Sequence, residues 1–339
     1  MFDKSVYCDK IINMTDFFLS LLLGIVSIVA IGKGSDWFTD SLIPIARKLG
    51  TSRISVGLIL VSVSVSLPEV LIVIYGVLEG HASLSFGVTL GSIICNIALM
   101  TGLSALVRPL QVSTVIILRD GIFSITVPVL IFAVGSTGMI TRIEGFAFFL
   151  LFIPYLINVF LQERERPEPK EERLKEIELE LDLLGFSFGK IRSAWIAFTL
   201  GLALLLAGAH LFTSQLIYLS KLFCIDERFI GMTIGAIGPS IPNIIAAYQA
   251  VKKGLTDVVV SETLGSNVFT LLVTLGILAV LSPVIISQKN LMFDIPAVIV
   301  MSSALFIFML SGKSVSKLEG AILIGGYVLF IIVQVFFEG

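Results

Sequence analysis

Glu69 lies near the middle of an apolar stretch that is long enough to cross a lipid bilayer, directly after Pro68 in the segment VSVSVSLPEV at 61–70. A carboxylate at the centre of a membrane helix costs about 2.5 to 3.5 kcal/mol on insertion scales, so such residues are rare and usually functional. Binding of a cation or a proton is the chemistry that this position predicts. The alternative is a structural carboxylate that neighbouring Ser and Asn side chains satisfy by hydrogen bonds.

The overall composition is that of a protein that crosses the membrane many times. The chain has 339 residues, of which 56% are hydrophobic and 14% charged, and its mean hydropathy is +1.02. These values exclude an ordinary soluble domain. A net charge of −2 offers no basic surface for nucleic acid, and there is no Walker loop for a nucleotide. We expect neither partner, no enzyme activity and no cofactor.

Ten apolar runs are long enough to span a bilayer, at about 20 residues each. We predict spans 1 to 5 at 17–44, 54–78, 84–106, 116–135 and 142–161, and spans 6 to 10 at 192–220, 230–250, 257–281, 291–311 and 318–337. The expected units are a first repeat at 1–161, a linker at 162–190 and a second repeat at 191–339. The polar linker contains apolar residues at helical spacing, which predict a short amphipathic helix: Leu174, Ile177, Leu181 and Leu184.

Positive residues are distributed unequally between the two ends of these spans. The loops after spans 1, 3, 5, 7 and 9 carry 16 Lys and Arg residues, and the opposite side, with the N-terminal tail, carries 6. Cytoplasmic loops hold the excess of Lys and Arg in membrane proteins. We therefore expect a multi-pass protein of the plasma membrane, surrounded by lipid, with both termini outside and the 162–190 linker in the cytoplasm.

The two halves of the chain repeat each other at a constant distance. Adding 174 to a residue number superimposes them without a gap. The identical pairs include Gly57 and Gly231, Ser66 and Ser240, Pro68 and Pro242, Gly91 and Gly265, Ser92 and Ser266, and Gly102 and Gly276. Because each half has an odd number of spans, the second half must enter the membrane in the opposite direction. The expected fold is an all-α polytopic protein of two inverted five-helix repeats, with a site between them at the midplane.

The best-matched segments are also those whose helices should be interrupted. Pro68 and Pro242 lie within spans 2 and 7, where a proline removes a backbone donor. A Gly–Ser pair lies within each of spans 3 and 8, at 91–92 and 265–266. Polar backbone at membrane depth is tolerated only where it lines protein or a wet cavity. The pattern predicts a ring of oxygen donors for a hard cation.

These segments resemble the two alpha repeats of the cation/calcium exchanger superfamily, in particular the prokaryotic sodium/calcium exchangers. The family pattern G-[TS]-S-[LI]-P-E followed by G-S-N-[IV] compares with SVSLPEV and GSIICN in the first repeat, and with GPSIPNI and GSNVF in the second. The resemblance implies that spans 2, 3, 7 and 8 hold the ions, while spans 1 and 6 slide across them to give alternating access. It implies side-chain ligands at Glu69, Ser66, Ser92, Asn96, Ser240, Asn243, Ser266 and Thr270. It also implies backbone carbonyl ligands near Ser62, Val65, Ala236 and Pro239.

The second repeat departs from the family pattern at its acidic positions. Asn243 stands where a second glutamate is expected, and Thr270 stands at the usual acidic position of span 8. Calcium prefers six to eight oxygens and its affinity follows ligand charge, so a single carboxylate predicts weak calcium binding. Glu262, one turn before Ser266, is a candidate compensating ligand or gate. Alternatively, it is an acid near a helix start, where the helix dipole favours negative charge.

Other polar residues also lie within the spans. His210, the repeat mate of Asp36, is inside span 6. Because histidine titrates near neutral pH, it is a candidate pH-sensing or proton-coupling group; the alternative is a hydrogen bond between helices. Asp120 and its mate Asp294 are expected at helix starts near the membrane interface, without bound ions.

The leading hypothesis is a secondary antiporter that exchanges sodium against calcium, with Ca2+ or Na+ at the Glu69 site and the chain acting as a monomer. One alternative is a divergent exchanger with weak or no calcium transport that moves Na+, K+ or H+ around Glu69. Another is a non-transporting membrane sensor on the same fold. Retention of Glu69, Ser92 and Asn96 favours transport over sensing.

Overall fold

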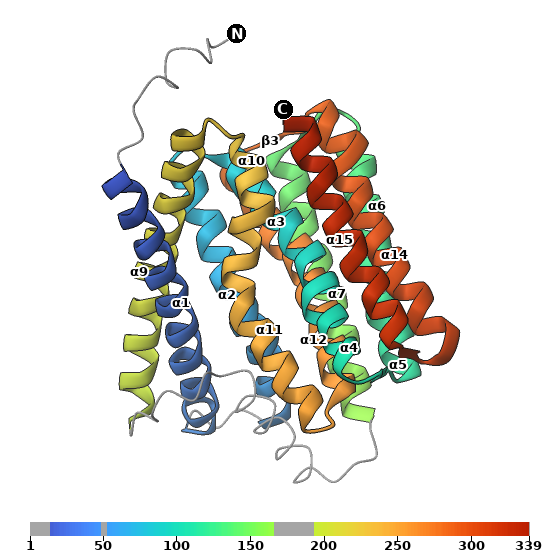
Figure 1. Ribbon diagram of the computed structural model, residues 1–339. Helices are drawn as coiled ribbons and strands as arrows, with labels where there is room; N and C mark the ends of the chain where they lie inside the picture. Colours follow the sequence, from blue (N-terminus) through green and yellow to red (C-terminus); the bar gives the residue numbers. More distant parts are fainter. Residues whose placement is uncertain (1–13, 49–52, 166–192, 339) are drawn as a thin grey trace.

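The computed structural model describes residues 14–48, 53–165 and 193–338. These residues form a bundle of long, roughly aligned helices (Figure 1). Ten helical segments follow one another, some with an internal π-helical turn marked η. Spans 1 to 5 are α1 (Met14–Lys48); α2 (Arg53–Leu78); α3 (Ala82–Cys95), η1 (Asn96–Gly102) and α4 (Leu103–Val107); α5 (Thr114–Ile116), η2 (Ile117–Gly121) and α6 (Ile122–Gly135); and α7 (Arg142–Glu165). Spans 6 to 10 are α9 (Ala194–Phe223); α10 (Glu227–Ile230), η3 (Gly231–Gly235) and α11 (Ala236–Lys252); α12 (Thr256–Phe269), η4 (Thr270–Thr274) and α13 (Leu275–Leu281); η5 (Asn290–Asp294) and α14 (Ile295–Gly312); and α15 (Lys317–Glu338).

The expected all-α polytopic fold is confirmed. Among the described residues, nine of these segments are long and apolar enough to cross a membrane. The remaining one is α2, whose side chains are described from Ser66 onward, where Ser66–Leu78 is apolar. The predicted linker helix and most of the 162–190 linker lie outside the described residues, and the boundaries of the two repeats stay predictions.

Two short pairs of strands show how the halves are inverted. β1 (Leu110–Gln111) pairs antiparallel with β4 (Ser314–Val315), and β2 (Met139–Ile140) pairs with β3 (Val284–Ile285). At an offset of 174 residues, β1 coincides with β3, and β2 overlaps β4 with a shift of one residue. Because span 4 separates β1 from β2, the two pairs lie at opposite ends of the bundle. Equivalent strands of the two halves therefore lie on opposite sides.

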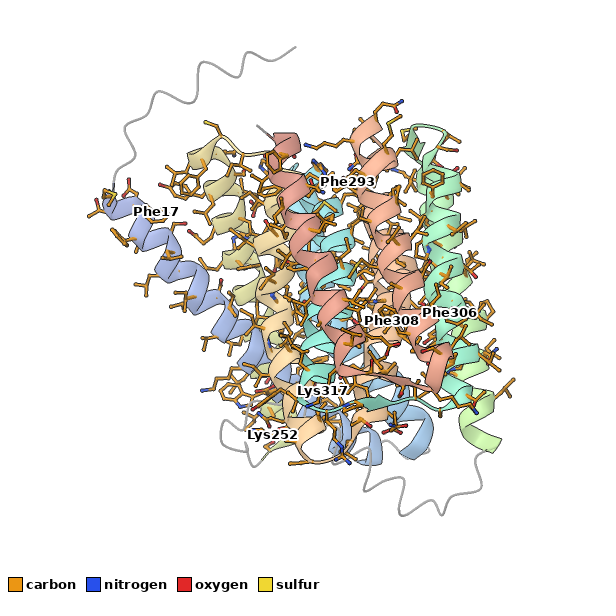
Figure 2. All side chains as sticks on the ribbon, turned by 45° about the vertical axis from the view of Figure 1, so that its right-hand side comes forward. Phe17, Lys252, Phe293, Phe306, Phe308 and Lys317 are labelled. Carbon is orange, nitrogen blue, oxygen red and sulfur yellow. The ribbon has the colours of Figure 1, made fainter. Side chains whose placement is uncertain are left out.

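Contacts between other loops follow the same alternation. The backbone N–H of Gln111 donates to Thr256 Oγ1 at 3.2 Å, which joins the loops after spans 3 and 7. Figure 2 shows Lys252 and Lys317 at one end of the bundle and Phe17, at the start of span 1, at the other. The loops after spans 3, 7 and 9, which the sequence assigns to one side, thus lie together. Which side is cytoplasmic stays a prediction.

Spans 1 and 6 form a close pair at one side of the bundle (Figure 1). A Cβ atom added to Gly34 would lie 2.7 Å from the backbone nitrogen of Leu205. A Cβ atom added to Gly201 would lie 2.5 Å from the backbone nitrogen of Phe38. Small residues allow membrane helices to pack backbone against backbone, so α1 and α9 form a tightly joined unit.

A reciprocal pair of crossings joins the two halves. A Cβ atom on Gly145 in α7 would lie 2.9 Å from the carbonyl oxygen of Gly276, and one on Gly320 in α15 would lie 2.7 Å from that of Gly102. Gly102 and Gly276 are repeat mates, 174 residues apart. Each half therefore packs its last span against the third span of the other half.

Addition of a single methyl group tests this crossing. Gly145→Ala would place its Cβ 2.6 Å from Ala279 Cβ, and overpacking of this kind costs about 1 to 3 kcal/mol. We expect a lower Tm for the detergent-solubilised protein. Gly325→Ala is the matched control because no atom lies within 4 Å of its added Cβ, and helix propensity there favours Ala. An equal Tm for both variants would contradict the close crossing.

Candidate cation site

Glu69 is buried in α2 without an ionic partner among the described residues. Its side chain is 1% exposed, and neither carboxylate oxygen accepts a hydrogen bond from another residue. The two buried arginines of the described chain, Arg119 and Arg228, pair with Asp120 and Asp294 instead. Burying a carboxylate without compensation is strongly unfavourable. Glu69 therefore needs a cation or a proton.

Side-chain hydrogen bonds connect spans 2, 3 and 8. The contact in span 2 is made by a residue one helical turn before Glu69. Ser66, one turn before Glu69, lies 3.0 Å from Ser266 between their hydroxyl oxygens. The Asn96 amide lies 3.5 Å from the same Ser266 oxygen and donates to Asn267 Oδ1 at 3.3 Å. Ser266 of α12 is thus the point where three of the four predicted binding spans meet.

Span 7 contributes Ser240 and Asn243 to the same region. Both side chains are buried, with exposed fractions of 0% and 9%. Helix α11 packs against both α2 and α3. These contacts connect span 7 to spans 2 and 3.

Spans 3 and 8 change from α-helix to π-helix at equivalent residues. The turn η1 begins at Asn96 and the turn η4 begins at Thr270, and these residues are repeat mates 174 apart. Single π-helical turns within α-helices occur frequently at functional sites. The change of helical pitch begins at the two positions that the family resemblance assigns to ligands.

Unpaired oxygen atoms concentrate in these four spans. Buried polar atoms in proteins nearly always have hydrogen-bond partners. The exceptions in these spans include Glu69 Oε1 and Oε2, Ser92 Oγ, Asn96 Oδ1, Ser240 Oγ, Thr270 Oγ1 and Thr274 Oγ1, whereas others, such as Ser302 Oγ and Tyr327 Oη, lie in other spans. In the described part of the chain, no three His, Cys, Asp or Glu side chains form a metal-binding group. One carboxylate surrounded by neutral oxygens suits a hard cation of low charge.

Two prolines in span 7 leave backbone carbonyl groups without a helical N–H donor. These carbonyls are next in sequence to the predicted carbonyl ligands. Pro239 and Pro242 lie inside α11, and neither has an N–H for the carbonyl four residues earlier. These carbonyls belong to Gly235 and Gly238, the neighbours of the predicted Ala236 and Pro239. Ala236 is fully buried and follows the π-helical turn η3 directly.

Pro68 has the same effect in α2, where it removes the donor for the carbonyl of Ser64. The predicted carbonyl ligands Ser62 and Val65 lie within this helix, but their side chains are outside those the structure describes. Ion binding by this backbone stays a prediction, as it does for the eight side-chain ligands.

Glu262 lies in the second turn of α12, one turn before Ser266. Helix α12 begins at Thr256, and its first-turn acid is Asp257. The helix-dipole effect falls off within the first turn, so the dipole gives Glu262 little stabilisation. Glu262 is partly buried, and its role as a compensating ligand or gate stays a prediction.

His210 lies on the side of α9 that faces the end of span 2. Its Nδ1 atom is 3.3 Å from Glu79 Oε1, and its ring packs on Tyr75 with centroids 5.1 Å apart. The side chain is 58% exposed, whereas the unpaired oxygens are buried. This contact between helices corresponds to the alternative reading of His210, and its pH sensing stays a prediction.

One residue near these oxygens was not predicted from the sequence. Asn267 contacts Asn96 across spans 3 and 8, and the signal for it was present in the GSN motif.

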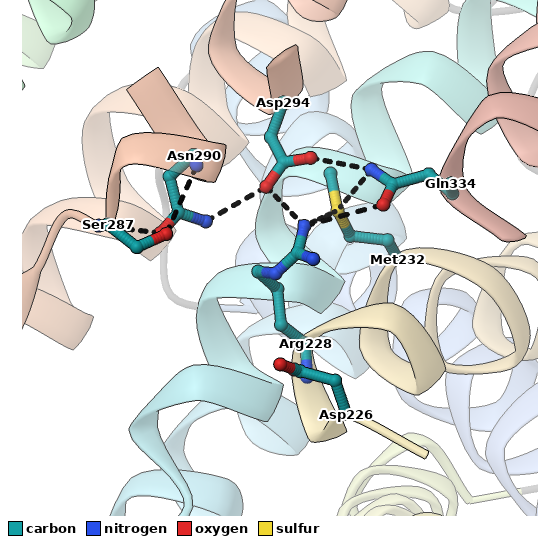
Figure 3. A network of polar contacts seen from close by, with 7 residues as sticks. All are labelled: Asp226, Arg228, Met232, Ser287, Asn290, Asp294 and Gln334. Atoms are coloured by element: carbon teal, nitrogen blue, oxygen red, sulfur yellow. Dashed lines mark hydrogen bonds and ion pairs between the residues drawn. The ribbon is translucent and has the colours of Figure 1, made fainter. Parts of the chain in front are cut away.

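Asp120 and Asp294 are fully buried within the protein, and their expected place near the membrane interface stays a prediction. Arg119 binds both carboxylate oxygens of Asp120, with N–O distances of 2.7 Å. Asp294 is held by three side chains (Figure 3): Arg228, Asn290 and Gln334. An arginine partner allows each aspartate to be buried, and a paired carboxylate is poorly suited to a transported cation.

Comparison with known proteins agrees with this arrangement. The sodium/calcium exchanger protein family matches this chain over residues 19–161 and again over 193–336. The chain belongs to this family. The sodium/calcium exchanger MaX1 of Methanosarcina acetivorans is 28% identical over 93% of this chain and 97% of its own length. The putative antiporter CaxA of Alkalimonas amylolytica is 29% identical over 90% of this chain and 95% of its own.

A solved structure of the sodium-calcium exchanger NCX_Mj has the same fold. It aligns with this exchanger over 93% of this chain and 98% of its own, with a TM-score of 0.63 and 24% identity. Family membership assigns the exchanger to membrane cation exchange in general, and its named relatives are transporters rather than enzymes.

Ser266 should be the side chain whose loss disturbs most contacts in this site. Ser266→Ala removes the partner of Ser66 and Asn96, and each buried group left unpaired costs about 1 to 3 kcal/mol. We expect a lower Tm in detergent and weaker protection by added cations. Ser261→Ala, partly buried on the same helix, should leave both values near those of the native chain. Native-like behaviour of Ser266→Ala would contradict this central position.

Proposed function

We propose that this exchanger is a secondary antiporter that exchanges sodium against calcium, with its ions bound around Glu69 between spans 2, 3, 7 and 8. The observation that carries the proposal is a fully buried carboxylate without a partner, accompanied by unpaired oxygens from the three other spans. The names of two relatives, a sodium/calcium exchanger and a putative antiporter, support the same activity.

In this proposal, Glu69 supplies the negative charge and the neutral side chains supply coordination. Ser66, Ser92, Asn96 and Ser266 contribute from one side of the site, and Ser240, Asn243 and Thr270 complete it. A single carboxylate balances one sodium ion, but it leaves a net positive charge on calcium in a medium of low dielectric constant. Calcium binding is therefore weak unless Glu262 also contributes.

Alternating access requires one part of the bundle to move against another. The α1–α9 pair is the natural moving part, because its two helices contact each other backbone to backbone. The pair moves across the ion-binding spans, with both termini outside, the 162–190 linker in the cytoplasm and the plasma membrane as the location. Each chain acts as a monomer in this scheme.

One observation favours the alternative of a monovalent exchanger. Asn243 and Thr270 are both neutral and buried, so the second repeat contributes no certain charge to the site. An exchanger that moves Na+, K+ or H+ around Glu69 needs no second carboxylate. A sensor that does not transport is the reading left if no ion gradient drives flux.

Sodium-gradient-driven calcium-45 uptake into proteoliposomes tests the proposal. The native chain should take up calcium, and Glu69→Gln should lose uptake by at least about tenfold, since the site loses its charge at equal volume. Asn243→Glu should lower the half-saturating calcium concentration because affinity follows ligand charge. Glu79→Gln, which replaces a partly exposed acid near the end of the same helix, is the control and should retain uptake.

The alternatives give different results in the same vesicles. A native chain without calcium uptake, which gains it as Asn243→Glu or exchanges sodium-22 for K+ or H+, would establish the monovalent exchanger. Silence of every variant under sodium, potassium, proton and calcium gradients would favour the sensor. Calcium uptake by Glu69→Gln equal to native would refute a Glu69 site.

A second comparison decides the role of Glu262. As a compensating ligand, Glu262→Gln should raise the half-saturating calcium concentration about tenfold, because metal affinity is sensitive to loss of nearby charge. Asp257→Asn removes the true first-turn acid of α12 and should cost only about 0.3 to 1 kcal/mol of stability. If both variants lower the Tm slightly and leave the calcium dependence unchanged, Glu262 is not a ligand.

A further inference from the structure

The fourth span of each half contains a fully buried aspartate that the cation site does not use. Asp120 and Asp294 are 0% exposed and are repeat mates. Each ends or nearly ends a π-helical turn, η2 (Ile117–Gly121) or η5 (Asn290–Asp294). The same position therefore carries the same charge and the same local helix distortion in both halves.

A cluster of four side chains around Asp294 connects the start of span 7 to spans 9 and 10 (Figure 3). Its members are Arg228, Asn290, Asp294 and Gln334. Arg228 of α10 binds Asp294 Oδ2, and Gln334 of α15 donates to Asp294 Oδ1 at 2.5 Å. Asn290, one turn earlier in span 9, donates to the same carboxylate at 2.9 Å. All four residues are at most 4% exposed, so the cluster is a fully internal connection among three spans.

The fastened segment of span 7 lies directly on span 3. A Cβ atom on Gly87 would lie 2.2 Å from the Arg228 carbonyl oxygen, and one on Gly91 would lie 2.5 Å from that of Met232. Met232 Sδ also accepts from Gln334 Nε2 at 3.5 Å. The residue after Gly91 is Ser92, whose buried hydroxyl has no hydrogen-bond partner. The cluster thus ends one residue away from a proposed ligand.

The other half has a weaker counterpart of this connection. Tyr155 of α7 donates from its hydroxyl to Asp120 Oδ1 at 3.1 Å. A Cβ atom on Gly265 would lie 3.7 Å from the same hydroxyl oxygen, and Gly265 precedes Ser266. Each buried aspartate is therefore connected to the glycine that precedes a proposed serine ligand in the opposite half.

We propose that Asp294, Arg228 and Gln334 form a positioning cluster for the cation site. The cluster holds segment 228–232 against Gly87 and Gly91, and this contact fixes the position of Ser92 in span 3. It also fixes the span 7 backbone that leads to the carbonyls without donors before Pro239 and Pro242. The cluster touches no ion. It rests on the proposed function, because it acts through ligands of the Glu69 site. Coordination depends on small displacements, and residues that only hold ligands commonly change metal affinity about 10- to 100-fold.

Two variants separate positioning from simple stabilisation. Asp294→Asn preserves side-chain shape but leaves Arg228 buried without its counter-charge. The double variant Asp294→Asn with Arg228→Gln removes both charges, so it avoids the isolated buried charge that threatens folding. Glu227→Gln is the matched control: it changes the preceding residue and breaks its 2.7 Å ion pair with His81, but it leaves the Asp294 cluster intact.

The Tm of each detergent-solubilised variant is measured against increasing CaCl2 and NaCl, because a bound cation raises Tm by mass action. Uptake in proteoliposomes then gives the half-saturating concentration and the maximal rate. We expect the double variant to shift both the Tm titration and the half-saturating concentration at least about tenfold upward. Its maximal rate should stay within about twofold of native, and Glu227→Gln should match native in all three quantities.

Three results would overturn the positioning cluster. A double variant with a lower Tm but an unchanged cation titration would show a purely structural role. An equal shift in Glu227→Gln would show that any disturbance of this end weakens binding. If the Tm of the native chain responds to neither salt, cation binding itself is rejected. This result is seen in the native protein alone, so it is distinguishable from a failure of the positioning cluster.

Discussion

The Glu69 carboxylate is buried without a partner among the described residues, and the rest of the proposed site depends on this constraint. A buried carboxylate is costly unless it is compensated. Asp120 and Asp294 meet this condition internally, each with its own arginine, and they connect spans permanently. Glu69 has no such partner among the described residues, and for this reason we propose it as the group that binds a transported ion or proton. The same chemical group is structural in one place and suited to exchange in another because of its neighbours.

The broken helices supply the rest of the coordination without adding charge. Prolines in spans 2 and 7 release carbonyls, and π-helical turns in spans 3 and 8 begin at Asn96 and Thr270. The inverted repeat makes these devices equivalent in geometry. It does not make them equivalent in charge, because the repeat mate of Glu69 is Asn243. The duplication thus provides a symmetric framework in which one half carries the certain negative charge.

Much of this framework could be predicted from the sequence. The lengths of the apolar runs predict the spans. The constant offset of 174 residues predicts the inversion and the equivalence of Ser66 and Ser240 in the two repeats. Local patterns do not say which distant residues will meet. The contact of Ser266 with Ser66 and Asn96 depends on how three spans cross, and the partner of Asp294 comes from α10, 66 residues away. The burial of Asp120 could not be predicted either, because a charge near a span end resembles a surface residue until its arginine is seen.

The number of carboxylates in the proposed site and the number of coordinating oxygens favour different ions. A single carboxylate favours a monovalent ion, because it balances only one positive charge. A shell of six to eight oxygens, in contrast, favours calcium. The number of oxygens that reach an ion depends on how closely spans 3 and 7 approach each other. Their backbones meet at Gly91 and Met232, where not even a Cβ atom fits. In the proposed site, calcium binding therefore depends on a second charge from Glu262 or on the rigidity of this approach, to which we propose that the Asp294 cluster contributes.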